Sequence, residues 1–342
     1  MSRVPYQELE DTIARAFVRA GMSAAKARTS ARFHAEASCD GVYSHGLNRV
    51  PRFVEYLTKG WVDAEAEPAP VRQIGPIEVL DGQRGPGILN ALHATDRALE
   101  LASEHGVGIV ALRNTTHWMR GGAFGWYAAD RGKVMIAWTN TESCMPAWGA
   151  SDTRLGNNPL VMAVPRAGGH VVLDMAMSQY SYGKLQTTRL RGAQLPYAGG
   201  FDSDGTLTTD PGSIEASRRI LPTGFWKGSG LTILLDVLAA ALSEGSATYQ
   251  IDKIDQGSCT GCSQIFLVFD PERLGSAEHL QEIVDGMADY VNGSTPAEAG
   301  RKVTYPGQNT LATRQDHRAN GVIVDDDIWR DVQALAGEKR PT

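Results

Sequence analysis

Residues 89–112 read LNALHATDRALELASEHGVGIVAL, and they contain both a helix pattern and a strand pattern. Leu92 and Leu99 fall on one side of a helix, and Gly106 is typical of the residue that ends such a helix. The apolar run Val107–Leu112 follows at once, and its short length favours a buried strand. A helix that leads directly into a buried strand predicts an α/β fold.

The same alternation continues through the middle of the chain, and the two ends are helical. Further strands are predicted at residues 77–80, 134–138, 160–164, 171–174 and 267–269. Helices are predicted through the first 70 residues, at 230–243, from 277 onward and over 322–336. We expect the helix over 230–243, which is rich in Ala and Leu, to be buried. Helix-rich ends predict a helical domain built from residues 1–72 with 276–342, around an α/β domain over 73–275.

The composition is that of an ordinary globular protein. Of the 342 residues, 42% are hydrophobic and 21% are charged. The net charge of −6 and the lack of a basic run argue against a nucleic-acid surface. No apolar run reaches the length of a membrane span, and the N-terminal segment lacks the apolar core of a signal peptide. We therefore expect a cytoplasmic protein with no nucleic-acid and no membrane partner.

The chain has four cysteines, and this sparse use fits a reducing compartment. Cys259 and Cys262 have CxxC spacing, but a zinc site would need two more ligands, and the sequence has no second CxxC or HxxxH. A redox role would need the pair to open a helix after a strand, whereas here it precedes the strand-like run Gln264–Phe269. The spacing therefore favours a local structural feature over chemistry.

A cluster of polar side chains lies in the segment Gly41–Arg49, which reads GVYSHGLNR. Ser44 can cap a helix that begins at His45, and from there His45, Asn48 and Arg49 share one helical face. An imidazole transfers a proton near neutral pH, and a guanidinium holds a carboxylate with two hydrogen bonds. The cluster suits a small anionic substrate that gains or loses a proton. A single histidine is more often structural, so both interpretations stay open.

Two further regions add candidates. Asn114, His117 and Arg120 follow the strand 107–112, and loops at strand ends often carry function. The alternative is a polar loop around buried aromatic side chains. The turn Leu155–Pro159 offers two Asn amides, and Lys184 could hold an anion, although a lysine is more often solvated.

The common nucleotide-binding fingerprint is absent from the sequence. Gly85-Pro-Gly87 begins a G-x-G-x-x-G motif, but the third glycine is missing. The sequence also has no P-loop, no G-x-S-x-G motif and no kinase motifs. The residues by themselves indicate a small-molecule enzyme that uses His45, Arg49 and His117, and they do not identify a cofactor.

Taken together, these segments resemble one family, the malate/L-lactate dehydrogenase type of NAD(P)-dependent oxidoreductases, which lacks the Rossmann fold. The resemblance covers nearly the whole chain and rests on Ser44-His45-Gly46 with Arg49, Asn114-x-x-His117, Leu155–Pro159, Val172–Ala176, Tyr182-Gly-Lys184 and Gly228–Leu231. Within the family, the chain is most similar to the 2,3-diketo-L-gulonate reductases. The segments that carry this likeness are Gly41–Gly46, Pro51–Phe53, Val110–Asn114, His117–Gly122, Gly199–Asp202, Arg219–Pro222 and Trp226–Gly230.

The resemblance implies an α/β fold with a non-Rossmann nucleotide-binding core, a mixed or antiparallel sheet, and a helical domain formed by both termini. It implies NADH or NADPH as the cofactor, no metal, and a homodimer whose active site borders the partner subunit. The positions that match the family's cofactor-binding segments are His170, Val171, Val172, Leu173, Asp174, Met175, Ala176, Trp226, Lys227, Gly307, Gln308 and Asn309.

The implied activity is the reduction of a 2-keto sugar acid, 2,3-diketo-L-gulonate, to 3-keto-L-gulonate. In our hypothesis a hydride reaches the C2 carbonyl, His45 donates the proton, and Ser44 hydrogen-bonds that imidazole or the substrate. Arg49 pairs with the substrate carboxylate, and His117 binds a substrate oxygen or polarises the carbonyl. Asn158 and Lys184 are lesser substrate-binding candidates.

Several alternatives stay open at this point. The same proton donor and carboxylate clamp would serve malate, lactate, sulfolactate, ureidoglycolate or a cyclic imino acid. A non-catalytic sugar-acid binding protein on the same fold is a further alternative. The loop Ile251–Cys262 departs from the family pattern, and its CxxC has no role in the family that we can name.

Overall fold

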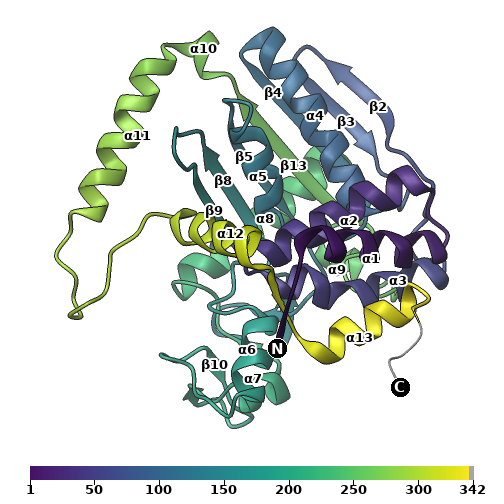
Figure 1. Ribbon diagram of the computed structural model, residues 1–342, viewed down its shortest axis with the longest axis vertical. Coiled ribbons are helices and arrows are strands. Elements are labelled where there is room, and N and C mark those ends of the chain that lie inside the picture. The colour runs from purple at the N-terminus through teal and green to yellow at the C-terminus, as the bar shows by residue number, and fades with distance from the viewer. Residues whose placement is uncertain (339–342) are drawn as a thin grey trace.

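The computed structural model describes residues 1–338, and its centre is a seven-stranded sheet (Figure 1). In spatial order the strands are β2 (Ala69–Ile74), β3 (Ile77–Asp81), β4 (Val107–Thr115), β13 (Cys262–Phe269), β5 (Val134–Thr139), β8 (Leu160–Val164) and β9 (Val171–Met175). β3 and β4 run parallel, and every other neighbouring pair in this sheet is antiparallel. The predicted α/β class with a mixed, mainly antiparallel sheet is confirmed, and this sheet differs from the parallel sheet of a Rossmann fold.

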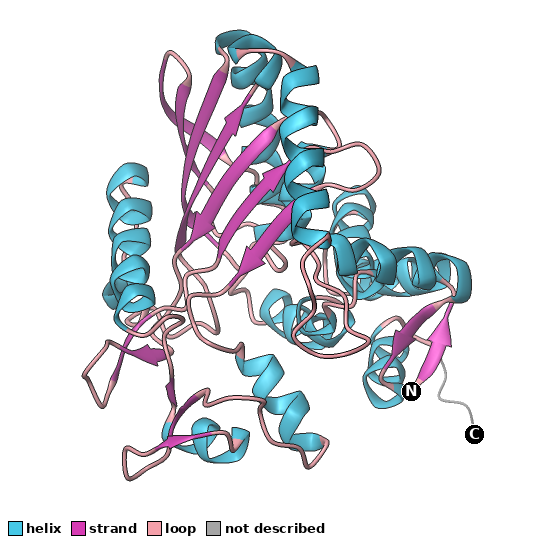
Figure 2. Cartoon of the chain, turned by 90° about the vertical axis from the view of Figure 1, so that its left-hand side faces the viewer, coloured by secondary structure: helices cyan, strands magenta, loops and turns pink. Residues whose placement is uncertain are grey.

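Helices cover both faces of this sheet (Figure 2). α4 (Gly87–His105) and α5 (Gly122–Ala129) pack on one face, and α8 (Trp226–Ser243) packs on the other. The side chains of β4 alternate accordingly, since Val110 and Leu112 belong to the core on the α4 side and Ala111 to the core on the α8 side. The helix and strand predicted from residues 89–112 are confirmed, with Gly106 in the left-handed conformation that ends α4.

The two ends of the chain meet beside this sheet. α1 (Tyr6–Arg19), α2 (Ala24–Cys39) and α13 (Asp326–Leu335) pack together, and β1 (Ser2–Val4) pairs with β14 (Val322–Val324). The single helix predicted over 322–336 is wrong in its first turn, because the β-branched run Val322–Val324 pairs with the N-terminal strand instead. The helix begins only after Asp325, whose side chain accepts hydrogen bonds from two N–H groups of the first turn.

α11 (Ala277–Asn292) lies at the opposite edge of the molecule from α1 and α13 (Figure 1). Its contact with the sheet includes an ion pair between Arg166, beyond β8, and Asp285, with 2.6 Å between Nε and Oδ1. The predicted domain boundaries, which group residues 276–292 with the N-terminal helices, stay a prediction.

The expectations for residues 230–243 need correction. The helix over 230–243 was expected to be buried, but one side of α8 is exposed. Its exposed apolar side chains are Leu231, Ile233, Leu234, Val237, Leu238 and Leu242. By length and composition α8 would also qualify as a membrane span, contrary to the expectation from the sequence, although its inner side packs on the sheet.

The remaining elements are short or peripheral. They are two 3-10 turns, η1 (Tyr43–His45) and η2 (Leu47–Arg49), the helices α3 (Val50–Thr58), α6 (Tyr182–Leu190), α7 (Pro211–Ser217), α9 (Thr248–Ile251), α10 (Pro271–Leu274) and α12 (Gln308–Asn320), and the strands β6 (Met145–Pro146), β7 (Thr153–Leu155), β10 (Gly200–Phe201), β11 (Leu207–Thr208) and β12 (Arg219–Ile220).

Candidate active site

The segment that carries His45 is held tightly against α2. Gly46 lies so close to α2 that a Cβ there would stand 2.2 Å from Ser38 Oγ, so no other residue fits. Leu47 N–H donates to the same Ser38 Oγ at 2.7 Å. The predicted N-cap role of Ser44 is wrong, because residues 43–49 form two 3-10 turns and the regular helix α3 begins only at Val50, with a proline at its start.

The structure brings together the residues that the sequence singled out from three distant segments. Ser44 Oγ lies 2.9 Å from His45 Nδ1, as expected for a hydroxyl that orients the imidazole. The rings of His45 and His117 have centroids 5.5 Å apart. Gly183, in the first turn of α6, packs against Ser44 so closely that a Cβ would stand 2.8 Å from Ser44 Cβ. Lys184 is the next residue on α6 and is exposed.

His117 has a defined orientation. Its Nδ1 accepts the backbone N–H of Met119 at 2.8 Å. Because Nδ1 is the acceptor, the neutral ring carries its proton on Nε2. That N–H group is available to donate to a substrate oxygen beside His45.

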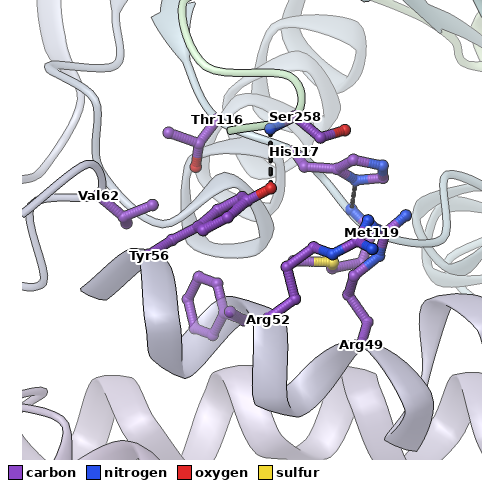
Figure 3. Close-up of a pocket in the computed structure, with 9 residues that line it drawn as sticks. Arg49, Arg52, Tyr56, Val62, Thr116, His117, Met119 and Ser258 are labelled. Carbon is purple, nitrogen blue, oxygen red and sulfur yellow. Dashed lines mark hydrogen bonds between the residues drawn. The ribbon is translucent and has the colours of Figure 1, made fainter. Parts of the chain in front are cut away.

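His117 borders a pocket with about 280 Å³ of empty space, open solvent included, whereas Ser44 and His45 are not among the residues that line it. Figure 3 shows Arg49 and Arg52 rising from the start of α3 toward His117. Tyr56 closes the far side, where its hydroxyl accepts the N–H of Ser258 at 2.8 Å. The lining residues are Arg49, Arg52, Phe53, Tyr56, Val62, Thr116, His117, Met119 and Ser258.

Burial and nearby positive charge disfavour the protonated form of every imidazole in this region. Burial, reinforced by Arg49 and Arg120, lowers the pKa of His45 to about 3. Burial and Arg49 likewise hold the pKa of His117 well below its usual value. His34, on α2, is fully buried, which lowers its pKa to about 4. All three rings are therefore neutral near pH 7 in the substrate-free protein.

These lowered pKa values predict that the free energy of unfolding falls as the pH is lowered from about 6.5 toward 4. Over this range the unfolded chain binds protons on these imidazoles, while the folded chain binds fewer. The folded pKa is about 4 for His34 and about 3 for His45, and that of His117 lies well below its usual value. The contribution of these imidazoles to the free energy of unfolding is therefore fully present above about pH 6.5. It is lost on acidification by about 1.4 kcal/mol per pH unit for each imidazole.

Urea unfolding at several pH values between about 7 and 4.5 measures this slope. We expect His34→Gln to reduce the slope by about one imidazole's share. His279→Gln is the matched control, since the His279 side chain is 72% exposed, and it should leave the slope unchanged. Equal slopes in all three proteins would contradict the assignment of the acid sensitivity to the buried rings.

Asn158 and Asn114 have their amides engaged within the protein. Asn158 Oδ1 accepts from Thr141 N–H at 3.0 Å, and its Nδ2 donates to Thr232 O at 2.9 Å. Asn114 Nδ2 donates to Asp81 Oδ1 at 3.0 Å. The amide of Asn158 therefore supports a turn, and a substrate-binding role for it stays an untested prediction.

Arg120 belongs to a buried ion network. It pairs with Asp40 at the end of α2, and Asp40 also binds Arg314 of α12, with 2.6 Å between Nε and Oδ1. The two arginines lower the pKa of Asp40 despite its burial. The sequence indicated Arg120 as a candidate but gave no sign of its partners, because they are distant in the chain. The network ties the loop after β4 to both ends of the chain.

Two of the predicted cofactor segments lie in direct contact. Val172 N–H, in β9, donates to Pro306 O at 2.9 Å. Gly307 has a φ of +97°, and a Cβ there would stand 2.9 Å from His170 O, so the backbones approach closely. His170 is itself held by Asp130, with 2.8 Å between Nε2 and Oδ1. Gln308 and Asn309 follow in the first turn of α12.

Unpartnered donors lie beside these segments. Trp126 lies near His170, with ring centroids 5.4 Å apart and planes tilted by 51°. Its indole N–H is buried without a hydrogen-bond partner within residues 1–338. Arg120 Nε is likewise buried without a hydrogen-bond partner in the described part of the chain, although it forms an ion pair with Asp174 Oδ2 at 3.9 Å. Close backbone approach and free N–H groups fit a ligand rich in phosphate and ribose oxygens, such as a nicotinamide dinucleotide.

Trp226 and Lys227 lie toward the other end of β9. Thr223 N–H donates to Met177 O at 2.8 Å, just beyond the end of the strand, and α8 starts soon after. Trp226 is 64% exposed. The three predicted cofactor segments are therefore arranged along β9. Gly307 contacts the start of this strand, and Trp226 lies beyond its end.

Comparison with known proteins bears directly on this arrangement. The sequence profile described as malate/L-lactate dehydrogenase matches residues 4–333. The chain belongs to this family. It is therefore an oxidoreductase, and the resemblance drawn from its motifs is confirmed. The chain is 42% identical to the 2,3-diketo-L-gulonate reductase of Escherichia coli K12, over 97% of this chain and 100% of that one.

Two solved structures of this malate/L-lactate dehydrogenase type share the fold. Sulfolactate dehydrogenase from Methanocaldococcus jannaschii superposes with a TM-score of 0.88 at 26% identity, covering 99% of this chain and 98% of that one. Delta1-piperideine-2-carboxylate reductase from Pseudomonas syringae superposes with a TM-score of 0.86 at 28% identity, covering 98% and 100%. The fold therefore serves reductases and dehydrogenases whose named substrates differ.

Of the nine residues that line the pocket, the sequence singled out only Arg49 and His117 as site residues, and the polar residues it missed include Arg52, Tyr56 and Ser258. A signal for Arg52 was present, because it lies three positions after Arg49 and shares its helical face once α3 is known to continue through Pro51. Ser258 had no such signal, since it is brought to the pocket only by the pairing of β13 with β4.

Proposed function

We propose that this oxidoreductase reduces 2,3-diketo-L-gulonate to 3-keto-L-gulonate with NADH or NADPH. The observation that supports this best is that His117 and Arg49 line one small pocket, with the His45 ring next to His117 at 5.5 Å between centroids. Within residues 1–338, Arg49 Nε has no hydrogen-bond partner. The pocket and the adjacent His45 offer a proton donor, a carbonyl-binding N–H and a carboxylate clamp, which are the groups that a 2-keto acid requires. The 42% identity with a named reductase of that substrate supports this particular keto acid.

The protein's residues divide the work as follows. Arg49 holds the substrate carboxylate with its planar fork. His117 Nε2–H donates to the C2 oxygen and stabilises the negative charge that develops there. His45, oriented by Ser44, gives a proton to the same oxygen through Nε2, and in the reverse direction the neutral ring accepts it. When the substrate carboxylate binds Arg49, its negative charge offsets the positive charge of the guanidinium. Substrate binding therefore raises the pKa of His45 from its low value in the substrate-free protein.

The nicotinamide supplies the hydride when it is bound. We propose that β9 with His170–Ala176, the start of α12 with Gly307–Asn309, and Trp226-Lys227 hold this cofactor. Gly307 permits close approach, and the free N–H groups of Trp126 and Arg120 offer donors beside it. Four free cysteines suit a reducing compartment, and we propose that the enzyme works in the cytoplasm.

A substrate panel tests the proposal. The purified protein is mixed with NADH or NADPH and with 2,3-diketo-L-gulonate, oxaloacetate, pyruvate, sulfopyruvate or a cyclic imino acid, and the loss of reduced nicotinamide absorbance is followed. We expect the highest kcat/KM with 2,3-diketo-L-gulonate. A higher value for another compound would move the assignment to that substrate, since the same three residues serve any 2-keto acid. No turnover with any of them would overturn the proposal.

We also propose that the chain forms a homodimer through the exposed side of α8. An 18-residue helix that exposes four leucines, an isoleucine and a valine to water is unusual for a monomer. Trp226 and Lys227 begin this same helix, so a partner seated on it would border the proposed cofactor site. A second copy is the occupant that the family resemblance favours.

We expect the wild-type chain to run as a dimer in size-exclusion chromatography with light scattering, and Leu234→Glu/Leu238→Glu to run near the chain mass of 36.8 kDa. Two buried carboxylates across a dimer axis would repel each other and lose their hydration. Leu190→Glu is the matched control, because Leu190 is an exposed leucine on α6, away from α8, and the dimer should persist. A wild-type monomer at micromolar concentration would contradict the dimer.

A further inference from the structure

Two guanidinium groups share the pocket without any acidic partner. Arg49 and Arg52 both line it, and both point from the start of α3 toward His117 (Figure 3). Within residues 1–338 neither side chain makes an ion pair or a hydrogen bond to a carboxylate. By contrast, Asp40 alone binds two other arginines nearby. Like charges that converge without a counter-ion indicate a ligand with more than one acceptor group.

The other polar side chains on the pocket wall each make a hydrogen bond within the protein. Ser258 Oγ donates to Glu142 Oε1 at 2.7 Å, and Tyr56 OH accepts Ser258 N–H. Thr116 Oγ1 donates to Gly85 O at 2.8 Å. Among the lining residues of the described chain, the side-chain donors that remain are His117 Nε2–H, the Tyr56 hydroxyl hydrogen and the two guanidinium groups. A substrate therefore meets His117 and two guanidinium groups, with the Tyr56 hydroxyl at the far side of the pocket.

The substrate of the proposed reaction has an acceptor for His117 and for each guanidinium group. Its carboxylate occupies Arg49, and its C2 oxygen lies between His45 and His117. We propose that Arg52 binds the oxygen on C3 of the substrate, and that it selects 2-keto acids with an oxygen at C3 over simple 2-keto acids. This inference rests on the function proposed above, and it names the feature of the substrate that the site selects. A 2,3-diketo acid presents that oxygen on the carbon next to the reacting carbonyl.

The expected selectivity is moderate. A hydrogen bond from a charged donor contributes about 1.5–3 kcal/mol, which corresponds to roughly 10- to 150-fold in kcat/KM. Arg52 is exposed, so water can solvate it when the C3 oxygen is missing, and we expect the lower part of that range.

Two small substrates that differ by a single oxygen test the inference. 3-Hydroxypyruvate carries an oxygen on C3, and pyruvate does not. We expect the wild-type enzyme to favour 3-hydroxypyruvate by about 10-fold or more in kcat/KM, and Arg52→Leu to abolish that preference. The kcat/KM for pyruvate should change by less than about threefold in the variant, because pyruvate has no C3 oxygen that Arg52 could bind. Where turnover is slow, both acids are compared as competitive inhibitors of 2,3-diketo-L-gulonate reduction.

Arg191→Leu is the matched control, since Arg191 is an exposed arginine at the end of α6 outside the pocket, and it should keep the preference. Oxaloacetate is a second test substrate, because its second carboxylate can compete for the same guanidinium group. If Arg52→Leu impairs oxaloacetate alone and leaves the preference for 3-hydroxypyruvate intact, Arg52 binds a second carboxylate and the inference is overturned. An unchanged preference with normal turnover would refute the role of Arg52 but leave the proposed reductase function standing, whereas absent turnover of every 2-keto acid would remove both.

Discussion

Replacing His45 with glutamine should lower the reductase kcat by about 10²–10⁴-fold, the usual contribution of a general acid–base group. Glutamine can still hydrogen-bond a substrate oxygen, but it cannot transfer a proton. KM for the keto acid should stay within about threefold, because Arg49 and His117 remain to bind it. Steady-state kinetics with 2,3-diketo-L-gulonate and saturating reduced nicotinamide measure both quantities.

The pH dependence separates proton transfer from simple loss of structure. In the wild-type enzyme, kcat/KM for reduction depends on the protonated fraction of His45, whose free pKa lies near 3. Above that pKa the fraction falls about tenfold per pH unit, so log kcat/KM should decline with a slope near −1 between about pH 5 and 8. In the oxidative direction the neutral ring is the base, and the same range should be flat. His45→Gln should flatten the reductive profile.

Ser44→Ala provides the matched control for this prediction. Its hydroxyl orients the imidazole through Nδ1, so its loss should lower kcat by much less than the loss of His45 and should keep the pH slope. A His45→Gln enzyme with near-normal kcat, or with an unchanged slope, would remove His45 from the role of proton donor and would point to His117 instead.

The parts of the fold that the sequence predicted are those that local pattern determines. The helix before Gly106 and the strand Val107–Leu112 need only their own apolar spacing and a glycine that accepts a left-handed conformation. The strand Val322–Val324 was mistaken for helix because its partner, β1, lies more than 300 positions away in the sequence. The exposure of α8 was equally invisible, since an apolar helix has the same composition whether a sheet or a second chain covers it.

The candidate site also has a part that the sequence could predict and a part that it could not. Ser44, His45 and Arg49 could be predicted because they are neighbours in sequence and their chemistry is complementary. His117 could be proposed because it follows a buried strand, and the structure places its ring beside His45. The environment of the imidazoles could not be predicted, because it depends on burial and on charges that the fold brings together. The cofactor segments still rest on resemblance, supported by the contact between β9 and the start of α12.

Replacing Arg49 with methionine should weaken substrate binding by about 10²–10³-fold. The substrate carboxylate would then be partly buried beside His117 without a paired charge, and truncation of one partner of such a pair costs about 2–5 kcal/mol. Arg49→Lys should recover part of the loss, because lysine keeps the charge but lacks the planar fork. Titration with a 2-keto acid in the presence of oxidised cofactor measures the binding constant directly. Arg32→Met, an exposed arginine of α2 outside the pocket, should bind normally.

The Arg49→Met substitution should stabilise the substrate-free fold although it weakens substrate binding. These opposite effects on stability and on binding are the strongest test of a binding role for Arg49. Arg49 Nε is buried without a partner within residues 1–338, and burial together with the charge of Arg52 lowers the pKa of Arg49. Methionine removes that unpaired charge and fills similar space, so Tm should rise by about 1–3 °C without ligand. A keto acid should raise Tm of the wild type but not of Arg49→Met. If Arg49→Met instead lowers Tm by several degrees, Arg49 serves the structure, and its place as the carboxylate clamp must be given up.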